Sequence, residues 1–207
     1  MTLRRIEMFI LTVLLLFMLL LLFGTLSAQA QSSLAVSAEG SFSSTTEAIY
    51  TRQNPFDQAG VLVELRHIWN PLFGYEVAYS VNRANQRYTY IGPSTTGPAP
   101  RTVRAYNHEI SADWVVSLPL ANFRPFALAG GGVQIFEPAG GQTGTQSDTK
   151  AVIVYGAGVD WEFMPHIGLR LQYRGNLYKA PDLAMAFPST DQLVHNAQPS
   201  AGIFLRF

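Results

Sequence analysis

The chain ends on the stretch Pro199-Ser200-Ala201-Gly202-Ile203-Phe204-Leu205-Arg206-Phe207. Within it, Ile203, Leu205 and Phe207 recur at every second position, which is the spacing of one face of a β-strand. An apolar face that closes on a terminal aromatic residue is typical of the last strand of a membrane-spanning barrel, because aromatic side chains favour the interface between lipid and water. We therefore predict an all-β transmembrane barrel, with Phe207, Leu205 and Ile203 as its C-terminal assembly signal.

The other end of the chain has the features of an export signal. Arg4 and Arg5 precede an apolar run over residues 9–23, and an Ala-x-Ala pattern follows at positions 28–30. This pattern predicts a signal helix over residues 1–30 that is cleaved at its end. The alternative is a retained helical anchor, since the apolar stretch approaches the roughly 20 residues that span a bilayer. The sequence has no Cys, which excludes lipidation of the new N-terminus and disulfides.

Residues 31–207 amount to one domain, the barrel itself. Alternation with a period of two recurs along them, and no long segment shows the apolar spacing of a helix. Each predicted strand is close to the roughly 9–11 residues that a tilted membrane strand needs. An even number of strands suits a closed antiparallel barrel, and we expect eight strands, over residues 34–43, 59–69, 72–82, 103–116, 123–136, 150–163, 166–175 and 196–207.

The predicted connections alternate in length. Short turns follow the second, fourth and sixth strands, at Asn70-Pro71, around Pro119 and at Met164-Pro165. Short turns on one side and long loops on the other are typical of outer-membrane barrels, with both termini on the periplasmic side. The long connections are rich in Gly, Ser, Thr, Pro and Asn, and they span residues 44–58, 83–102, 137–149 and 176–195.

The positions of the aromatic residues indicate which face of the barrel meets lipid. A soluble, lipocalin-like barrel also alternates, but its aromatic residues would gather near the middle of its core. Here they form two belts on the apolar phase, as a lipid-facing surface requires. Trp69, Phe73, Trp114, Phe163 and Phe207 fall at the short-turn ends of their strands, and Tyr79, Tyr106 and Tyr173 towards the long-loop ends.

The opposite phase is polar or small and should fill the lumen. If the turn at Pro71 is symmetric, Arg66 lies directly across from Glu76, and by the same count about Pro165, Arg170 lies across from Asp160. Cross-strand partners share a face, so both would be internal ion pairs. Because an eight-stranded barrel is only wide enough for side chains to fill it, we expect a plugged lumen and no porin channel.

The fifth strand is the exception to this assignment. Residues 126–133 are apolar or small on both phases, so the sequence does not assign the facing of this strand. The three consecutive glycines at 130–132 predict a bulge or a close approach of two backbones.

The pattern resembles the outer-membrane β-barrel domain family, the OmpA-like and OmpX-like eight-stranded barrels. The resemblance is carried by residues 124–132, by Tyr155-Gly156-Ala157-Gly158-Val159-Asp160-Trp161, by residues 168–174 and by the closing strand. It implies a bacterial outer-membrane protein that the barrel-assembly machinery inserts, with a structural, adhesive or resistance-conferring role. Two-domain relatives carry a peptidoglycan-binding domain after the barrel, but we expect none here because the sequence stops at the predicted final strand.

Catalytic and metal-binding patterns are weak in this sequence. A deacylase on a barrel wall needs a Ser close to a His on the same face, but His195 is followed two positions later by Ala197, and His108 has Tyr106 and Ile110 as its neighbours. The four histidines are dispersed and there is no Cys, so we expect no metal and no cofactor. We expect no catalysis, with a lipid A-modifying enzyme or a narrow channel as the less favoured alternatives.

One loop carries a distinctive charge pattern. The overall charge is balanced, with 14 basic and 14 acidic residues, and it indicates no nucleic-acid partner. Residues 82–107, however, contain no acidic residue, and their arginines are interspersed with tyrosines. Guanidinium groups beside aromatic rings suit an anionic glycan at the cell surface, or the phosphates of lipopolysaccharide at the barrel rim. The candidate contacts are Arg83, Arg87, Arg101 and Arg104.

Overall fold

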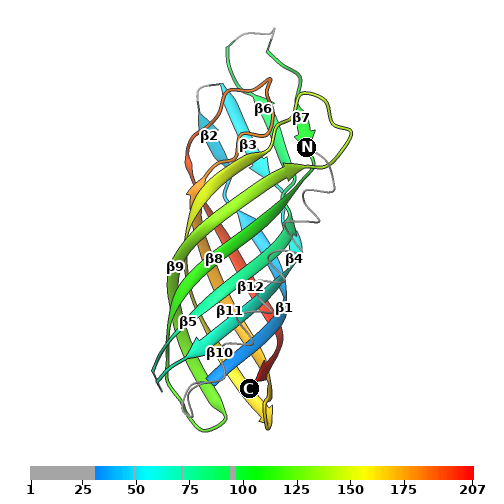
Figure 1. The fold of residues 1–207 in the computed structure, drawn as a ribbon. Coiled ribbons are helices and arrows are strands. Elements are labelled where there is room, and N and C mark those ends of the chain that lie inside the picture. Colours follow the sequence, from blue (N-terminus) through cyan, green and yellow to red (C-terminus); the bar gives the residue numbers. More distant parts are fainter. Residues whose placement is uncertain (1–30, 49, 71, 94–96) are drawn as a thin grey trace.

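The computed structural model describes residues 31–48, 50–70, 72–93 and 97–207; the predicted signal helix lies outside them. Eight antiparallel strands close into a barrel in the order β1-β12-β11-β10-β9-β8-β5-β4 (Figure 1). This confirms the predicted fold class. Within the described ranges no helix is long and apolar enough to cross a bilayer. The barrel strands are β1 (Gln31–Ser43), β4 (Gln58–Ile68), β5 (Phe73–Arg83), β8 (Ala105–Ser117), β9 (Phe123–Pro138), β10 (Asp148–Met164), β11 (Ile167–Lys179) and β12 (Leu193–Arg206).

The barrel strands lie where the alternation predicts them, although several are longer than expected. Strand β1 begins at Gln31 instead of residue 34, and β11 continues to Lys179 instead of residue 175. The C-terminal strand β12 pairs with β1 and closes the cylinder, and Phe207 donates its backbone N–H to Ser32 and accepts one in return. The C-terminus lies at the short-turn end, opposite the long loops (Figure 1).

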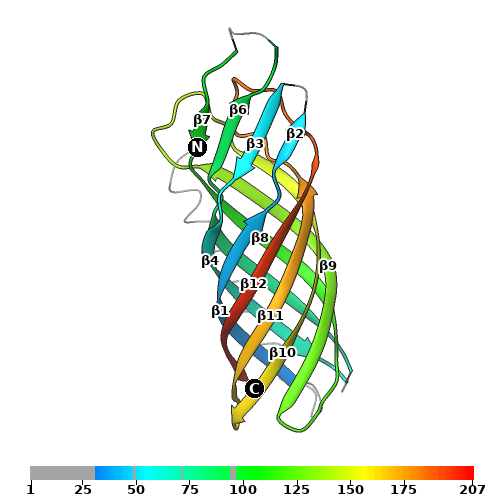
Figure 2. The ribbon, with the colours of Figure 1, turned by 180° about the vertical axis from the view of Figure 1, so that it is seen from behind.

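Two of the long connections are not simple loops, which corrects the sequence-based expectation. They contain the short strands β2 (Thr46–Ala48), β3 (Thr51–Pro55), β6 (Gln86–Tyr90) and β7 (Arg101–Val103). These form one four-stranded sheet in the order β2-β3-β6-β7, which stands beyond the barrel rim (Figures 1 and 2). The central pairing joins β3 to β6, strands from different loops, so local sequence gives no turn signal for it.

A second segment, residues 180–192, covers the inner face of this sheet. We call the sheet and this segment together the cap. The Tyr88 ring packs 5.6 Å from the Phe187 ring, and Leu183 is fully buried beside them. Tyr88 donates its hydroxyl to the Pro181 carbonyl at 3.1 Å and accepts the Leu183 N–H at 3.2 Å. Burial raises the pKa of the Tyr88 phenol well above its usual range. The cap therefore has its own small core above the barrel.

The outer surface of the barrel carries the aromatic belt expected for lipid contact. All five residues of the short-turn belt are exposed, and the most exposed is Trp114, at 67 %. The Trp69 and Trp114 rings meet edge to face at 5.7 Å, and Phe123 stacks on Trp161 at 6.1 Å. Apolar side chains thus face outward while polar ones fill the interior, which is the arrangement of a membrane barrel.

Strand β9, whose facing the sequence left open, turns out to be regular. Its register continues without a shift through Gly130–Gly132 against both β8 and β10, so the three glycines make no bulge. Gly132 allows a close approach instead, because a Cβ there would collide with the backbone of Ile110 on β8. Phe126 and Leu128 are buried, and they join other inward apolar side chains, such as Leu62 and Phe204, among the polar residues of the lumen.

Candidate functional site

The lumen contains both ion pairs that the turn symmetry predicts. Arg66 lies directly across from Glu76, with Nη2 2.6 Å from Oε2. Arg170 lies directly across from Asp160, and its Nε donates to Oδ1 at 2.7 Å. All four side chains are almost completely buried. Strand pairing across two tight turns is therefore enough to bring each guanidinium to its carboxylate.

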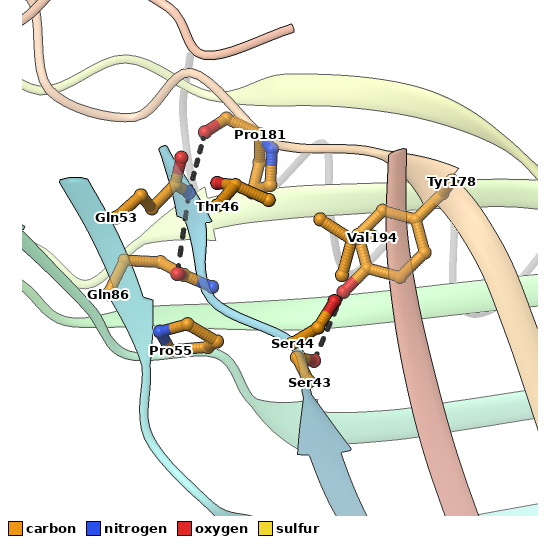
Figure 3. A pocket seen from close by; sticks show the side chains of 9 residues that line it. All are labelled: Ser43, Ser44, Thr46, Gln53, Pro55, Gln86, Tyr178, Pro181 and Val194. Carbon is orange, nitrogen blue, oxygen red and sulfur yellow. Dashed lines mark hydrogen bonds between the residues drawn. The ribbon is translucent and has the colours of Figure 1, made fainter. Parts of the chain in front are cut away.

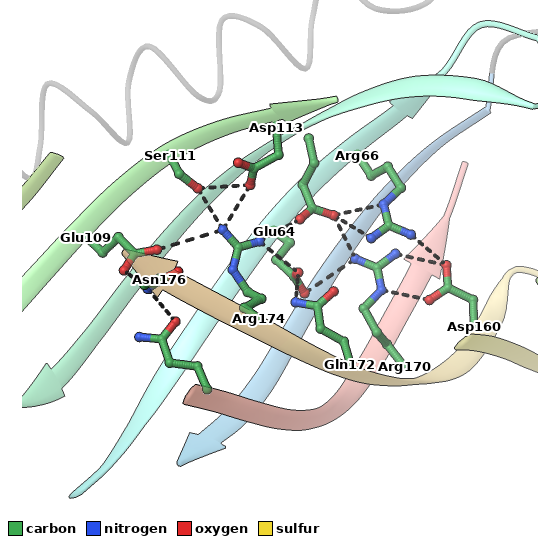
Figure 4. A network of polar contacts seen from close by, with 12 residues as sticks. Glu64, Arg66, Glu109, Ser111, Asp113, Asp160, Arg170, Gln172, Arg174 and Asn176 are labelled. Carbon is green, nitrogen blue, oxygen red and sulfur yellow. Dashed lines mark hydrogen bonds and ion pairs between the residues drawn. The ribbon is translucent and has the colours of Figure 1, made fainter. Parts of the chain in front are cut away.

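The two pairs are joined directly, because Arg66 also lies 3.3 Å from Asp160, and a third arginine, which the sequence did not single out as a partner, extends the network (Figure 4). Arg174 lies 3.0 Å from Glu76 and 2.9 Å from Asp113. Glu76 also lies 3.4 Å from Arg170, so three guanidiniums share its carboxylate. Because these contacts cross the barrel between strands that are not neighbours, strand alternation alone could not assign them.

Side chains fill the centre of the barrel. Arg66, Arg170 and Arg174 are among the largest fully buried residues. Towards the short-turn end, the Arg66 guanidinium lies 3.8 Å from the centre of the Phe126 ring, a cation–π contact. Gln172 crosses to Glu64 with an Nε2 to Oε1 distance of 2.6 Å. This packing supports a lumen closed by side chains.

At the other end, two adjoining polar clefts separate the barrel mouth from the cap. Both are narrow, with room for about one water molecule at most, and both are lined by Ser43, Pro55, Gln86 and Tyr178. Figure 3 shows Gln53 bridging this space, since its amide donates to Gln86 at 3.3 Å and to the Pro181 carbonyl at 3.0 Å. These amide contacts join the sheet of the cap to its segment 180–192 above the barrel mouth.

The four candidate surface arginines do not form one cluster. Arg87 projects from the exposed face of the cap sheet, directly across from Asn54 on one side and Thr102 on the other. Arg83 ends β5 at the rim, and Arg104, also exposed, lies between β7 and β8. These three arginines therefore occupy separate places on the cap and rim.

Arg101 has a different environment from the other three. Its guanidinium donates to the backbone carbonyls of Thr143 and Gly144, at 3.4 Å for the latter, and so holds a neighbouring loop. A fifth arginine that the sequence argument missed, Arg52, shares the exposed face of the sheet with Arg87 and is ion-paired with Glu47. Its nearness to Arg87 depends on the β3–β6 pairing.

The histidines on the barrel wall pair with hydroxyl groups. His108 Nδ1 lies 2.8 Å from the Tyr79 hydroxyl, and His195 Nε2 lies 2.8 Å from that of Tyr155. His67 Nδ1 lies 3.0 Å from Ser32 Oγ, a Ser–His contact that the sequence search did not find. In the described part of the chain, no carboxylate is hydrogen-bonded to His67, and no three His, Asp or Glu side chains gather as metal ligands.

A closed antiparallel barrel with an apolar outer face, aromatic belts and a polar interior defines a β-barrel membrane protein. In a comparison with known protein families, residues 16–207 match the outer membrane protein beta-barrel domain. The chain belongs to this family, in agreement with the resemblance seen in the sequence. It is a protein of the bacterial outer membrane.

Solved structures share the fold at low sequence identity. Ail of Yersinia pestis, in complex with the heparin analogue sucrose octasulfate, has a TM-score of 0.55 and 15 % identity, covering 86 % of this chain and 99 % of its own. OprG of Pseudomonas aeruginosa has a TM-score of 0.57 and 9 % identity, with 86 % and 96 % covered. Neisserial surface protein A has a TM-score of 0.51 and 14 % identity, and the match covers 86 % of this chain and 99 % of that protein. Comparison with curated protein sequences gave no match.

Proposed function

We propose that this protein is a non-catalytic surface protein in which a closed barrel anchors an ordered cap, and that the cap recognises ligands outside the cell. The observation that carries the proposal is the combination of a lumen filled by Arg66, Arg170 and Arg174 with a four-stranded sheet beyond the rim. Such an interior supports anchoring more than passage, because polar side chains occupy the space a solute would need.

The closed lumen is tested in planar bilayers. The purified protein should insert without producing stable conducting steps, because the buried side chains leave no continuous path. A reproducible conductance on the order of tens of picosiemens or more would contradict this part of the proposal. Glu76→Ala and Arg174→Ala variants, which remove large lumen side chains, provide a comparison in which leakage should rise.

For the ligand, we propose an anionic glycan bound by Arg83, Arg87 and Arg104. This is supported by their exposure on the cap and rim, and by the absence of acidic residues between positions 82 and 107. Arg101 acts differently, as a positioning residue for the loop at Gly144. The solved complex of Ail with the heparin analogue sucrose octasulfate is consistent with this ligand class, although that ligand belongs to Ail. Lipopolysaccharide phosphates of the same membrane are the other source of the same chemistry.

Binding of immobilised heparin and of purified lipopolysaccharide, each to lipopolysaccharide-free protein, distinguishes the two sources. We expect salt-sensitive heparin binding that an Arg87→Glu, Arg104→Glu double variant reduces about tenfold or more. The matched control is Lys179→Glu, an exposed cation that is paired with Asp191 away from the arginines. Retention of lipopolysaccharide alone would assign the arginines to the membrane rim, and unchanged heparin binding by the double variant would refute the glycan site.

Catalysis is tested separately. We propose that the Ser32–His67 contact is structural, since in the described residues it lacks a carboxylate that would orient the imidazole. The mass spectrum of lipid A from cells that express the protein should equal that from cells without it. A mass shift that disappears with Ser32→Ala would establish a lipid A-modifying enzyme instead.

A further inference from the structure

The lumen has an excess of negative charge. Among the described residues, the buried charged side chains comprise six carboxylates and only three guanidiniums. An uncompensated charge in a low-dielectric interior is costly, so native proteins pair it, protonate it or bind an ion. The carboxylates are those of Glu39, Glu64, Glu76, Glu109, Asp113 and Asp160, and the guanidiniums those of Arg66, Arg170 and Arg174.

The excess is concentrated at the cap end of the lumen, at Glu39 and Glu109. Within the described chain Glu39 makes no ion pair; its Oε1 accepts the Asn82 amide at 3.0 Å. Glu109 lies 3.8 Å from its nearest guanidinium, that of Arg174. The three arginines thus pair mainly with the carboxylates nearer the short-turn end. Glu39 and Glu109, nearer the cap, remain without a close cation.

Strand register brings these two carboxylates to one place. On β5 and β8, Ser80 lies directly across from Glu109, and Asn82 directly across from Asn107. Glu39 on β1 reaches Asn82 over Gly60, whose missing side chain leaves the space that the Glu39 carboxylate occupies. The two acidic side chains therefore flank the same pair of β5 residues, one from each side.

The same region contains buried oxygen atoms that have no partner. Glu39 Oε2 and Asn107 Oδ1 each lack a hydrogen bond within the described residues, and both side chains are at least 97 % buried. The amides of Gln134 and Asn176 both donate to Glu109 Oε2, at 2.7 and 2.5 Å, and this leaves their own oxygens beside it without a donor. Buried acceptors without donors are rare in native structures, so this group indicates an absent positive partner.

We propose that the upper lumen binds a hard divalent cation, Ca²⁺, between Glu39 and Glu109. Two carboxylates neutralise its charge, and amide and hydroxyl oxygens from Asn107 and Ser80 provide the neutral ligands that Ca²⁺ accepts. Sulfur and imidazole ligands, which zinc favours, are not among these groups. Asn82 and Asn107 also line the cleft at the barrel mouth, so the site borders on that cleft. The site is independent of any ligand bound by the cap.

The test uses full-length mature protein refolded into lipopolysaccharide-free detergent and dialysed against EDTA. CaCl₂ is titrated at constant ionic strength, and the temperature at which half the protein loses its folded gel mobility is recorded. We expect a saturable rise in this midpoint, because an ion that binds only the folded barrel stabilises it. Equilibrium dialysis with radioactive calcium should give about one ion per folded chain.

Two single variants test whether calcium binds at Glu39 and Glu109. Glu39→Gln and Glu109→Gln should each raise the half-saturating calcium concentration about tenfold or more, since each removes one of two charged ligands. In EDTA both variants should be at least as stable as the unsubstituted protein, because they reduce the excess negative charge. Glu47→Gln, an exposed carboxylate in the cap, is the control and should respond to calcium normally.

Two outcomes would overturn the proposal. A midpoint that CaCl₂ raises no more than NaCl does would mean that protons neutralise the excess charge. A calcium response that both lumen variants retain in full would place the ion elsewhere.

Discussion

At the scale of single residues, Glu76 holds the central position in the lumen. Its carboxylate is shared by Arg66, Arg170 and Arg174, with closest distances between 2.6 and 3.4 Å. Glu64 is equally buried, but its nearest guanidinium is 3.4 Å away and its main partner is the neutral amide of Gln172. The two residues have the same side chain and burial, yet different partners, so they separate the effect of pairing from that of burial.

The first prediction compares these two glutamates. Glu76→Gln should destabilise the barrel by about 3 kcal/mol, the usual cost of removing one member of a buried ion pair. Glu64→Gln should cost less than about 1 kcal/mol, because a glutamine oxygen still accepts from Gln172 and one excess negative charge is removed. Unfolding by urea in detergent measures both. Equal losses for the two variants would show that the guanidinium contacts of Glu76 contribute nothing specific.

The second prediction concerns the pairing of Arg170 with Asp160. Arg170→Glu should strongly reduce the folded fraction, because it adds a seventh carboxylate to the lumen and removes one guanidinium. Adding Asp160→Arg should restore part of the loss, but not all of it, since Arg170 also faces Glu64 and Glu76. The folded fraction after refolding, read by gel mobility, completes the double-mutant cycle. An absence of any rescue would indicate that the two residues act independently.

At the scale of elements, β9 shows how backbone proximity replaces side-chain packing. Gly132 faces the lumen against the backbone of Ile110, whereas a Cβ on the neighbouring Gly131 would lie 3.0 Å from the nearest atom, the carbonyl oxygen of Val152. The cap is stabilised differently, because its strands pair between two loops and pack on the segment 180–192.

The third prediction tests the β8–β9 contact. Gly132→Ala should destabilise the barrel by about 1–3 kcal/mol, because the added methyl group forces the two backbones apart. Gly131→Ala, in the same strand but with more space, should cost clearly less. Heat-induced loss of folded gel mobility compares them. The close approach would be disproved if Gly132→Ala matched the unsubstituted protein.

The fourth prediction separates the stability of the cap from that of the barrel. Tyr88→Phe removes the hydroxyl that joins Pro181 and Leu183, and it should increase hydrogen exchange and proteolysis in residues 180–192, with a local cost of about 1–2 kcal/mol. The barrel's thermal midpoint should stay unchanged. Tyr50→Phe, at an exposed tyrosine, is the control. A concerted loss of barrel stability would show that cap and barrel unfold together.

At the scale of the whole molecule, the closed barrel and the cap are two distinct parts with different environments. The hydrogen-bonded cylinder has no free edge among its eight strands, and its aromatic belt faces lipid. The cap lies beyond the rim, at the end opposite Phe207 (Figure 2). The membrane-spanning cylinder and the region for which we propose ligand recognition are thus separate parts of the structure.

The fifth prediction follows from this closure. Protein from outer-membrane fractions should migrate differently on a detergent gel before and after boiling, because the closed barrel resists detergent until heated. N-terminal sequencing should begin at Gln31, as the cleavage pattern predicts. A single heat-independent band in the inner-membrane fraction would contradict both the barrel and the removal of the signal.

The sequence by itself determined the eight barrel strands, the facing of most of them and the two local ion pairs. Alternation fixes which side chains face lipid, and tight turns fix register, so Arg66–Glu76 and Arg170–Asp160 follow from counting residues across a turn. The surface arginines were identified by composition, but not their separation or the different role of Arg101. Only the tertiary structure decided the facing of β9, the sheet formed between two loops, the sharing of Glu76 and the oxygen-rich site at Glu39 and Glu109. These features depend on contacts between residues far apart in the chain, and their geometry is set by the closure of the barrel, which no local pattern encodes.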